Sequence, residues 1–443
     1  MPKITFIGAG STIFAKNILG DCLSTPALNT NLSIALYDID AARLEDSTRM
    51  VETLNRNLAG GKAQVKAYLG VAQRKDALRG AHYIVNAIQV GGYEPSTVID
   101  FEIPKKYGLR QTIADTLGIG GIFRALRTIP VLMDIADDIL EVCPDAWFLN
   151  YSNPMAMLTD ALLRRGIKTV GLCHSVQVCA TELLKSLDMP QDNLQWKIAG
   201  INHMAWLLEI SRNGVDLYPE IKAKAAAKNA AALAPEGTKH KDMVRFEMMR
   251  HFGYYITESS EHNAEYSPYW IKAKYPQLVD QFNIPLDEYP RRCRNQIANW
   301  ATMRDNILGD KALTHERTHE YGSFIIEAME TDVPYRIGGN VRNDGLITNL
   351  PREAVVEVAC LVDRNGVQPT YVGDLPAQLA ALNRTNINPQ LVTVDAALSR
   401  KREGIYHAAY LDPHTSAELS LDDIRNLCDD LIEAHGDMMP NFR

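Results

Sequence analysis

The first residues of the chain constrain its fold more than any other segment. Lys3 to Ile7 is a short apolar run typical of a strand, and Gly8-Ala9-Gly10-Ser11-Thr12 follows it directly. From Ile13 to Leu23, apolar residues then recur at helical spacing. This order of strand, glycine turn and helix is typical of a dinucleotide-binding unit, because glycines let the backbone approach a pyrophosphate at the start of the helix. We therefore expect Gly8, Gly10, Ser11 and Thr12 to bind a dinucleotide.

A carboxylate at the end of the next strand indicates which dinucleotide is bound. Leu32 to Tyr37 is a second apolar run, and Asp38 ends it. Asp38 could accept hydrogen bonds from an adenosine ribose and would repel a 2′-phosphate, which predicts NAD rather than NADP. The pattern departs from the common fingerprint, since Ile13 replaces the third glycine and Asp38 lies farther along the chain than usual. The alternative is a tight turn followed by a surface aspartate.

The rest of the N-terminal part alternates apolar runs with a helical pattern. Further strands are predicted at Tyr83 to Val90, Trp147 to Leu149 and Thr169 to Leu172, with a long helix over Phe123 to Val142. Continuous apolar strands separated by helices favour an α/β fold whose parallel sheet is covered on both faces. We therefore predict a Rossmann-type domain over residues 1–195.

The pattern changes after about residue 195. Ile198 to Ile210 is typical of a strand, and Lys222 to Leu233 predicts a solvated helix. Asp422 to His435 predicts a closing helix with Gly436 as its C-cap. We therefore expect residues 196–443 to form a second domain.

Composition excludes several classes of function. The 443 residues carry 46 Lys and Arg against 54 Asp and Glu, a net charge of −8, which argues against a nucleic-acid binder. We see no apolar run of about 18 residues, so we expect no membrane span. The seven cysteines are scattered without a CxxC pair, which favours a reduced, cytoplasmic protein.

Polar side chains gather where three of the apolar runs end. These segments are Asn150 to Pro154, Gly171 to Ser175 and Gly200 to His203. Within them, a thiolate from Cys173 and an imidazole from His203 could share a divalent metal. Spacing alone favours the other interpretation, in which Cys173 is an ordinary buried thiol and His203 a structural histidine.

Two further segments are dense in functional residue types. The glycines of Asp115 to Gly121 suit the close approach of a ligand to a helix N-terminus. Glu258 to Tyr266 packs several titratable groups into nine residues. That second segment is either an acidic surface loop or a loop that delivers a general base.

Taken in order, these segments resemble the NAD- and metal-dependent family 4 glycoside hydrolases from end to end. The resemblance lies in FIGAGST (6–12), QVGGYEP (89–95), DTLGIGGIFRALRT (115–128), NYSNPMA (150–156), GLCHSV (171–176), AGINHMAW (199–206), ESSEHNAEY (258–266) and NVRNDGLITNLP (340–351). The Cys-His-Ser form at 173–175 and the segment at 258–266 are most similar to the α-galactosidase (melibiase) branch.

This resemblance implies a fold like lactate and malate dehydrogenases, in which residues 196–443 form an α+β domain that binds substrate and metal. It also implies a homo-oligomer. It implies a hydrolase that oxidises carbon 3 of an α-galactoside with NAD, eliminates the aglycone, adds water and reduces the sugar again. Mn²⁺ would be held by Cys173 and His203, and Asn153 and Gly120 would contact sugar or cofactor. His174 stands where other members carry the acid that protonates the leaving group. The base would be His262 or Tyr266, supported by Asp115.

One departure from the family bears on the substrate. Members that act on sugar 6-phosphates carry an arginine shortly after the segment that matches Gly91-Gly92, whereas this chain has Glu94-Pro95-Ser96-Thr97. Because a phosphate needs a cation or a nest of amides, we predict an unphosphorylated substrate. The alternatives are an α-glucosidase or α-glucuronidase of the same family, a simple NAD-dependent sugar dehydrogenase that releases NADH, and a non-catalytic NAD-binding redox sensor.

Overall fold

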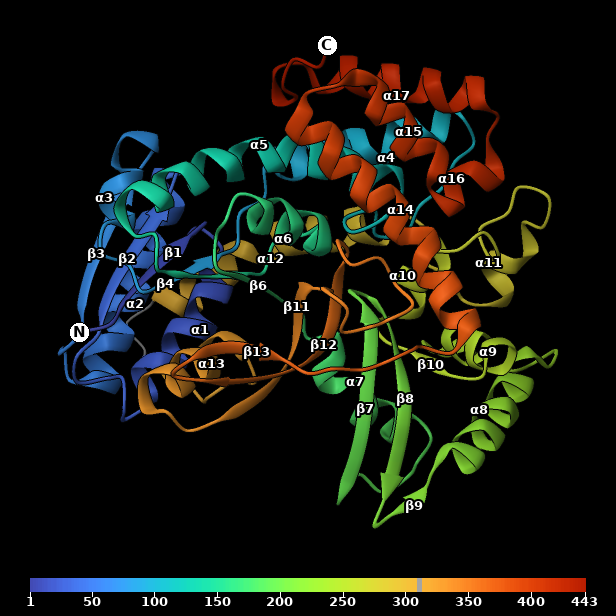
Figure 1. Ribbon diagram of the computed structural model, residues 1–443, viewed down its shortest axis with the longest axis horizontal. Helices are drawn as coiled ribbons and strands as arrows, with labels where there is room; N and C mark the ends of the chain where they lie inside the picture. The colour runs from blue at the N-terminus through green and yellow to red at the C-terminus, as the bar shows by residue number, and fades with distance from the viewer. Residues whose placement is uncertain (309–312) are drawn as a thin grey trace.

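The computed structural model describes residues 1–308 and 313–443, and one sheet runs through both halves of them (Figure 1). Its strands follow the order β10-β8-β7-β12-β11-β6-β5-β4-β1-β2-β3. The half from β6 to β3 is parallel and has the 3-2-1-4-5-6 order of dinucleotide-binding folds. The strands of this half are β1 (Lys3–Ile7), β2 (Ser33–Asp38), β3 (Gln64–Leu69), β4 (Tyr83–Asn86), β5 (Trp147–Asn150) and β6 (Thr169–Leu172).

The other half of the sheet is antiparallel and continues from β6. Its first strand, β11, pairs with β6 at Gly339↔Leu172 and Asn340↔Gly171. One sheet therefore contains strands from both sides of residue 195, and one of these strands straddles that position. The strands of this half are β7 (Leu194–Ile201), β8 (Met204–Arg212), β9 (Val215–Asp216), β10 (Tyr255–Ile256), β11 (Tyr335–Arg342), β12 (Val355–Asp363) and β13 (Gly366–Pro369).

Helices cover both faces of the parallel half, because its strands are apolar on both sides. Ile4 and Phe6 of β1 belong to the core beneath α1 and α2, whereas Ile7 belongs to the core beneath α5. The helices of residues 1–195 are α1 (Thr12–Ser24), α2 (Ala41–Ala59), α3 (Arg74–Leu78), α4 (Val98–Lys106), α5 (Gly118–Val142), α6 (Met155–Arg164) and α7 (Ser175–Ser186).

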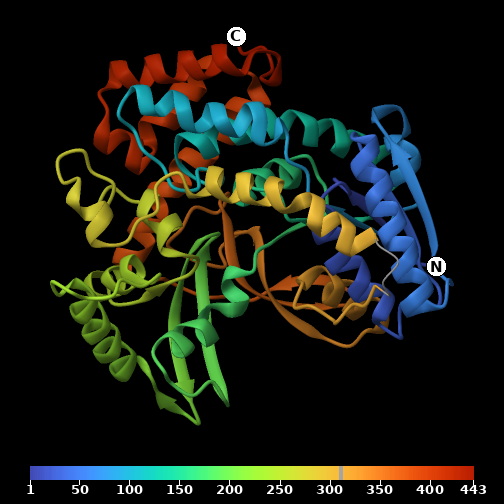
Figure 2. The ribbon, with the colours of Figure 1, turned by 180° about the vertical axis from the view of Figure 1, so that it is seen from behind.

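Helices from the second half pack back onto the first. At the top of Figure 1, α14 crosses α5 and α6, and α15 to α17 close the same layer. Seen from behind, α12 runs across the molecule toward α2 (Figure 2). These helices are α8 (Tyr218–Leu233), α9 (Met243–Phe252), α10 (Ser260–Glu265), α11 (Gln277–Gln281), α12 (Glu288–Leu308), α13 (Tyr321–Thr331), α14 (Ala377–Ser399), α15 (Arg402–Leu411), α16 (Pro413–Glu418) and α17 (Leu421–His435).

Two predicted strands differ from those observed. The run Ile198 to Ile210 is not one strand but part of the hairpin β7–β8, which turns at Asn202 and His203. His203 adopts a left-handed φ of 62°, which lets two residues reverse the chain inside an apolar run. The run Tyr83 to Val90 is strand only as far as Asn86, and the residues after it border the site.

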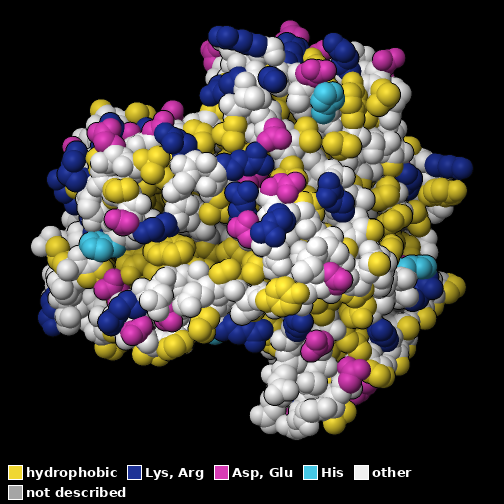
Figure 3. All heavy atoms as spheres, in the orientation of Figure 1, with side chains coloured by type: hydrophobic (Ala, Val, Ile, Leu, Met, Phe, Trp, Pro, Cys, Tyr) yellow, Lys and Arg dark blue, Asp and Glu magenta, His cyan; other side chains and the backbone are white. Residues whose placement is uncertain are grey.

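The surface agrees with the mixed composition. On the face drawn in Figure 3, Lys and Arg side chains are interspersed with Asp and Glu. Within residues 1–308 and 313–443, no helix has both the length and the apolar character that a membrane crossing requires.

Candidate functional site

An open cavity of about 510 Å³ lies where the parallel half of the sheet meets the antiparallel half. The segments that follow β4, β5 and β6 reach it, as do the β7–β8 turn and the segment after β10. This is the edge at which open α/β sheets bind ligands. Its lining residues are Ser11, Phe14, Ala87, Ile88, Gln89, Asp115, Arg124, Tyr151, Ser152, Asn153, Met155, Leu172, Cys173, His174, His203, Glu258 and Tyr289.

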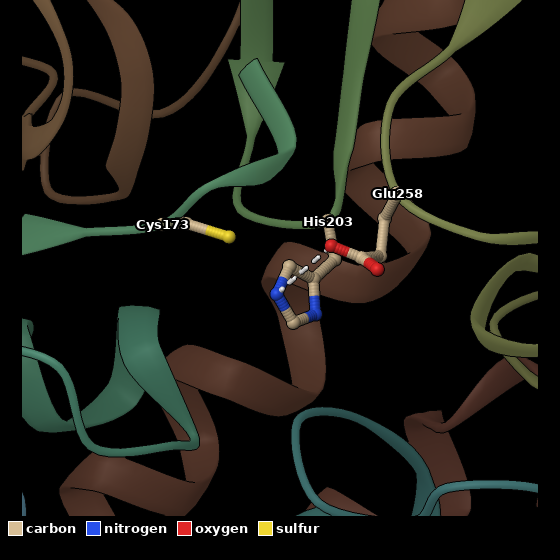
Figure 4. Close-up of side chains that lie close together, drawn as sticks. All are labelled: Cys173, His203 and Glu258. Carbon is tan, nitrogen blue, oxygen red and sulfur yellow. Dashed lines mark ion pairs between the residues drawn. The ribbon is translucent and has the colours of Figure 1, made fainter. Parts of the chain in front are cut away.

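Three potential metal ligands meet in this cavity. Cys173 follows β6, His203 occupies the hairpin turn, and Glu258 follows β10. Their ligand atoms lie within 4.8 Å of one another. Figure 4 shows the Cys173 sulfur and the Glu258 carboxylate both directed at the His203 ring. A thiolate, an imidazole and a carboxylate can hold one divalent cation, and the open cavity leaves room for substrate oxygens beside it.

The His203 ring is fixed from behind by a tyrosine. Its Nδ1 is 3.1 Å from the hydroxyl of Tyr266, and its Nε2 is 3.6 Å from Glu258 Oε2. A hydrogen bond on one ring nitrogen orients the other toward a metal, as in many metal sites. His262 packs edge-on against the same ring, with centroids 5.0 Å apart, and its Nδ1 is 2.6 Å from Ser259 Oγ.

The electrostatics of the three-ligand cluster favour a cation. Burial lowers the pKa of His203, but Cys173 and Glu258 outweigh this effect and raise its pKa to about 10. Burial raises the pKa of Glu258, but His203 and His262 outweigh it and lower that pKa to about 2. Without a metal, a proton on His203 supplies the positive charge that the cluster demands.

Burial shifts the pKa values of the two candidate bases, Tyr266 and His262, in opposite directions. Burial raises the pKa of Tyr266 well above its usual value, and nearby Asp115 adds to the effect. Burial also lowers the pKa of His262, which favours the neutral imidazole. Neither side chain is among the described residues that line the cavity, because both lie behind His203.

Asp115 lies at the centre of a hydrogen-bonded group in the cavity wall. Its carboxylate accepts hydrogen bonds from Asn153 Nδ2 at 3.1 Å and from Thr116 Oγ1 at 2.8 Å. Arg124 Nε donates to the carbonyl of Asn153 at 3.3 Å. These contacts fix three polar side chains of the cavity wall, so they can present donors and acceptors to a polyhydroxylated ligand.

The glycine turn after β1 has the geometry of a phosphate-binding loop. Gly8 has a φ of 83°, and a Cβ there would lie 2.8 Å from the carbonyl carbon and oxygen of Ala87. The N–H of Gly10 donates to Asp38 Oδ2 at 2.6 Å. Ser11 lines the cavity, whereas Thr12 is buried with its hydroxyl 2.9 Å from Ser47 Oγ. Ile39, beside Asp38, is 75% exposed and offers an apolar surface at the end of β2.

The structure thus brings many of the predicted residues together. Ser11, Asp115, Asn153, Cys173, His174 and His203 share the cavity. Gly120 lies instead against Ala114, whose carbonyl oxygen and Cβ would be 2.7 Å from an added Cβ. Five polar residues of the cavity wall were not predicted individually as site residues, namely Glu258, Arg124, Gln89, Tyr151 and Tyr289. The first four lie inside the quoted motifs, whereas Tyr289 lies outside all of them.

Comparison with known proteins agrees with this geometry. The model of the family 4 glycosyl hydrolases matches residues 3–189, and the model of their C-terminal domain matches residues 198–415. A curated relative, an α-galactosidase from Bacillus subtilis (strain 168), is 64% identical over 444 residues, covering 100% of both chains.

Solved structures share the fold. A 6-phospho-α-glucosidase from gut microorganisms, solved in complex with NAD and Mn²⁺, has a TM-score of 0.76 at 21% identity, covering 100% of both chains. A malate dehydrogenase from Plasmodium falciparum has a TM-score of 0.52 at 12% identity, covering 90% of this chain and 99% of its own. The expected Rossmann-type, dehydrogenase-like architecture is therefore confirmed. With both family models matched along most of its length, the chain belongs to the family 4 glycosyl hydrolases.

Proposed function

We propose that this chain is an NAD- and Mn²⁺-dependent α-galactosidase that cleaves unphosphorylated α-galactosides such as melibiose. One observation carries the proposal: Ser11 of the dinucleotide loop lines the same cavity as the Cys173–His203–Glu258 cluster. A nicotinamide and a metal could therefore act on one sugar ring. The curated relative at 64% identity, named an α-galactosidase, supports the choice of substrate.

The residues fit both groups. Gly8 lets the turn pack closely against Ala87 in the strand–turn–helix arrangement that binds a pyrophosphate, and Asp38 with exposed Ile39 suits an adenosine. Cys173, His203 and Glu258 would hold the metal. When bound, the nicotinamide supplies a reversible hydride acceptor for carbon 3 of the sugar, and the metal supplies Lewis-acid polarisation of the oxygens on carbons 2 and 3.

The side chains around the cluster would move the protons. Two candidates for the base that takes the proton on carbon 2 adjoin His203, namely the Tyr266 hydroxyl oxygen and an imidazole nitrogen of His262. Asp115 and Asn153 orient the sugar through their shared hydrogen bond. His174, on the cavity wall, gives a proton to the glycosidic oxygen as it leaves.

A substrate panel tests the proposal. Aryl α-galactoside, aryl α-glucoside and their 6-phosphates are assayed with and without NAD⁺ and Mn²⁺. We expect cleavage of the unphosphorylated α-galactoside only when both are present, with no net accumulation of NADH. Net NADH would instead indicate a simple dehydrogenase. The proton on carbon 2 should exchange with deuterated solvent during turnover, and its full retention without an isotope effect would exclude the elimination route.

The metal ligands are tested by one cysteine variant and its matched control. Cys173→Ser is expected to lose bound Mn²⁺ and activity together, because it removes one of three ligands. Cys143→Ser, a change at a buried cysteine at the end of α5, should keep both. Metal content is measured by atomic absorption after dialysis. Stoichiometric Mn²⁺ in Cys173→Ser would overturn the assignment.

Two further properties belong to the same proposal. The seven cysteines are all free, which suits a reducing compartment such as the cytoplasm. We also propose a homo-oligomer, which light scattering coupled to gel filtration would measure.

A further inference from the structure

A carboxylate from the second half of the chain reaches the predicted acid. Glu320 Oε2 is 2.7 Å from Nε2 of His174. Glu320 is 7% exposed, whereas more than half of the His174 side chain is exposed at the cavity. Within the part of the chain that the structure describes, no other side chain is hydrogen-bonded to the His174 ring. The orientation of this ring therefore depends on Glu320.

The Glu320 side chain does not cap the helix that it precedes. It occupies the N-cap position of α13, where a polar side chain usually accepts a hydrogen bond from the first turn. The Glu320 side chain accepts none there and extends to His174 instead. The carboxylate is therefore directed at the His174 ring and not at the first turn of α13.

A buried anchor fixes the segment that carries Glu320. Asp21, in the last turn of α1, accepts hydrogen bonds from the Thr318 N–H at 2.7 Å and the Thr318 hydroxyl at 2.6 Å. His315 Nε2 is 2.7 Å from the same carboxylate, and Ser323 Oγ donates to it at 3.2 Å. Asp21 thus fixes the backbone on both sides of Glu320.

Two contacts attach the same segment to the cavity wall. The N–H of Gly322 donates to the Tyr151 hydroxyl at 2.7 Å, and Gln177 Nε2 donates to the carbonyl of His319 at 2.6 Å. Tyr151 lines the cavity, and Gln177 follows His174 in α7. The carboxylate therefore has a fixed position relative to the ring that it contacts.

From these contacts we propose that Glu320 is the positioning residue for His174. The carboxylate holds Nε2, so the ring presents Nδ1 to the leaving group, as the aspartate does for the histidine of a serine protease. This rests on the proposed function, in which His174 is the acid.

In this proposal, the proton on His174 Nδ1 moves to the leaving oxygen. As the bond between carbon 1 and oxygen breaks, its electron pair stays on the oxygen, which takes the Nδ1 proton and departs as an alcohol. The electron pair released at carbon 2 forms the carbon 1–carbon 2 double bond. In the later hydration, a water oxygen bonds to carbon 1 and gives a proton to Nδ1. The electron pair of the double bond takes back onto carbon 2 the proton that the base had removed.

Leaving-group dependence tests the proposal. Glu320→Ala is compared with Glu327→Ala, a change two turns along α13 at a residue paired with Arg317. Substrates are melibiose, whose leaving alcohol needs a proton, and dinitrophenyl α-galactoside, whose leaving group does not. We expect Glu320→Ala to lower kcat on melibiose roughly 100-fold, because general acids contribute about 10²–10⁴-fold, and to change kcat on the activated substrate by less than about threefold. Glu327→Ala should affect neither.

A double variant separates positioning from a merely structural role. In a His174→Asn background, adding Glu320→Ala should cause no further loss on melibiose, because its effect passes through the ring. Equal losses on both substrates, or additive losses in the double variant, would overturn the proposal. Should Glu320→Ala fail to fold, Glu320→Gln permits the same comparison, with a selective loss of roughly tenfold expected for the removed charge.

A crystal structure of Glu320→Ala gives a readout independent of turnover. We expect the His174 ring to rotate away from the cavity while Asp21 and Thr318 stay in contact. A ring that stays in place would contradict the positioning role. If the wild-type enzyme cleaves no galactoside, the proposed function fails, and this structure still reports on the ring.

Discussion

Single residues decide the electrostatics of the dinucleotide loop and of the metal-ligand cluster. Asp38 accepts two backbone N–H groups, from Gly10 at 2.6 Å and from Asp40 at 2.9 Å, so its carboxylate lies against the dinucleotide loop. In the cluster, His203 lies beside the Cys173 sulfur and the Glu258 carboxylate. Each charge predicts a measurable property of ligand binding.

Asp38→Asn should weaken NAD binding and lessen the discrimination against NADP. The charge-assisted hydrogen bonds to a ribose contribute about 1.5–3 kcal/mol, so we expect the Kd for NAD⁺ to rise roughly 10- to 100-fold. Asp40→Asn is the matched control, since Asn also caps α2 at this position. Tryptophan fluorescence titration measures both variants. An unchanged Kd in Asp38→Asn would remove Asp38 from the cofactor site.

Metal binding should release a proton from His203. With its pKa at about 10, this ring is protonated at pH 7 in the metal-free protein, and a metal ligand must be neutral. We therefore expect release of about one proton per Mn²⁺ at pH 7, and an affinity that rises with pH up to about 10. Calorimetry in buffers of different ionisation enthalpy measures the release. Metal binding without proton release at pH 7 would contradict the raised pKa.

The helices and strands that position the site residues could be predicted from the sequence in some places and not in others. The strand, glycine turn and helix at the N-terminus follow from local pattern, and the structure has them at Lys3–Ile7 and Thr12–Ser24. The hairpin at Asn202 and His203 could not be predicted as a turn, because it has no glycine or proline and apolar residues flank it. It depends on a left-handed histidine, which tertiary contacts such as the Tyr266 hydrogen bond stabilise.

Some residues of the candidate site could likewise be predicted from the sequence, and others could not. Cys173, His174 and His203 follow or join predicted strands, so the topology alone brings them to one edge. Glu258 belongs to a dense segment, but which of its side chains enters the cavity depends on a φ of 64° that no pattern announces. Glu320 lies far along the chain, outside every quoted motif, and its role depends on the buried contacts of Asp21.

Two glycines allow the cost of a steric clash to be distinguished from the cost of a left-handed backbone conformation. Gly8 and Gly61 both have a positive φ, of 83° and 72°, but an added Cβ meets Ala87 at 2.8 Å in the first and nothing within 4 Å in the second. Gly61→Ala should cost about 1–2 kcal/mol of unfolding free energy, from conformation alone. Gly8→Ala should cost more and abolish NAD binding, because it separates the ends of β1 and β4. Thermal unfolding and NAD titration measure both, and equal effects would show that crowding at Gly8 is unimportant.

At the scale of the whole molecule, one sheet and one helical layer join the two halves. β6 pairs with β11, and α14 packs on α5 and α6. The two halves of the chain on either side of residue 195 thus share their hydrophobic cores, because the two largest clusters each contain residues from both halves.

A fragment of residues 1–195 should therefore not fold independently. It would leave the outer edge of β6 unpaired and the apolar faces of α5 and α6 uncovered. Calorimetry should show one cooperative transition for the full chain and none for the fragment. Cooperative unfolding of the fragment, together with NAD binding, would establish two independent domains instead.

Helix α1 has a ligand loop at its beginning and, through Asp21, a fastening for the distant segment 315–323 near its end. This one helix therefore supports two parts of the site that lie far apart along the chain. We expect that a dinucleotide-binding half taken from a dehydrogenase could replace this one only if it carried an equivalent aspartate, since the segment around Glu320 would otherwise lose its anchor. An engineered exchange of this half would therefore have to preserve the far end of α1 as well as its ligand loop.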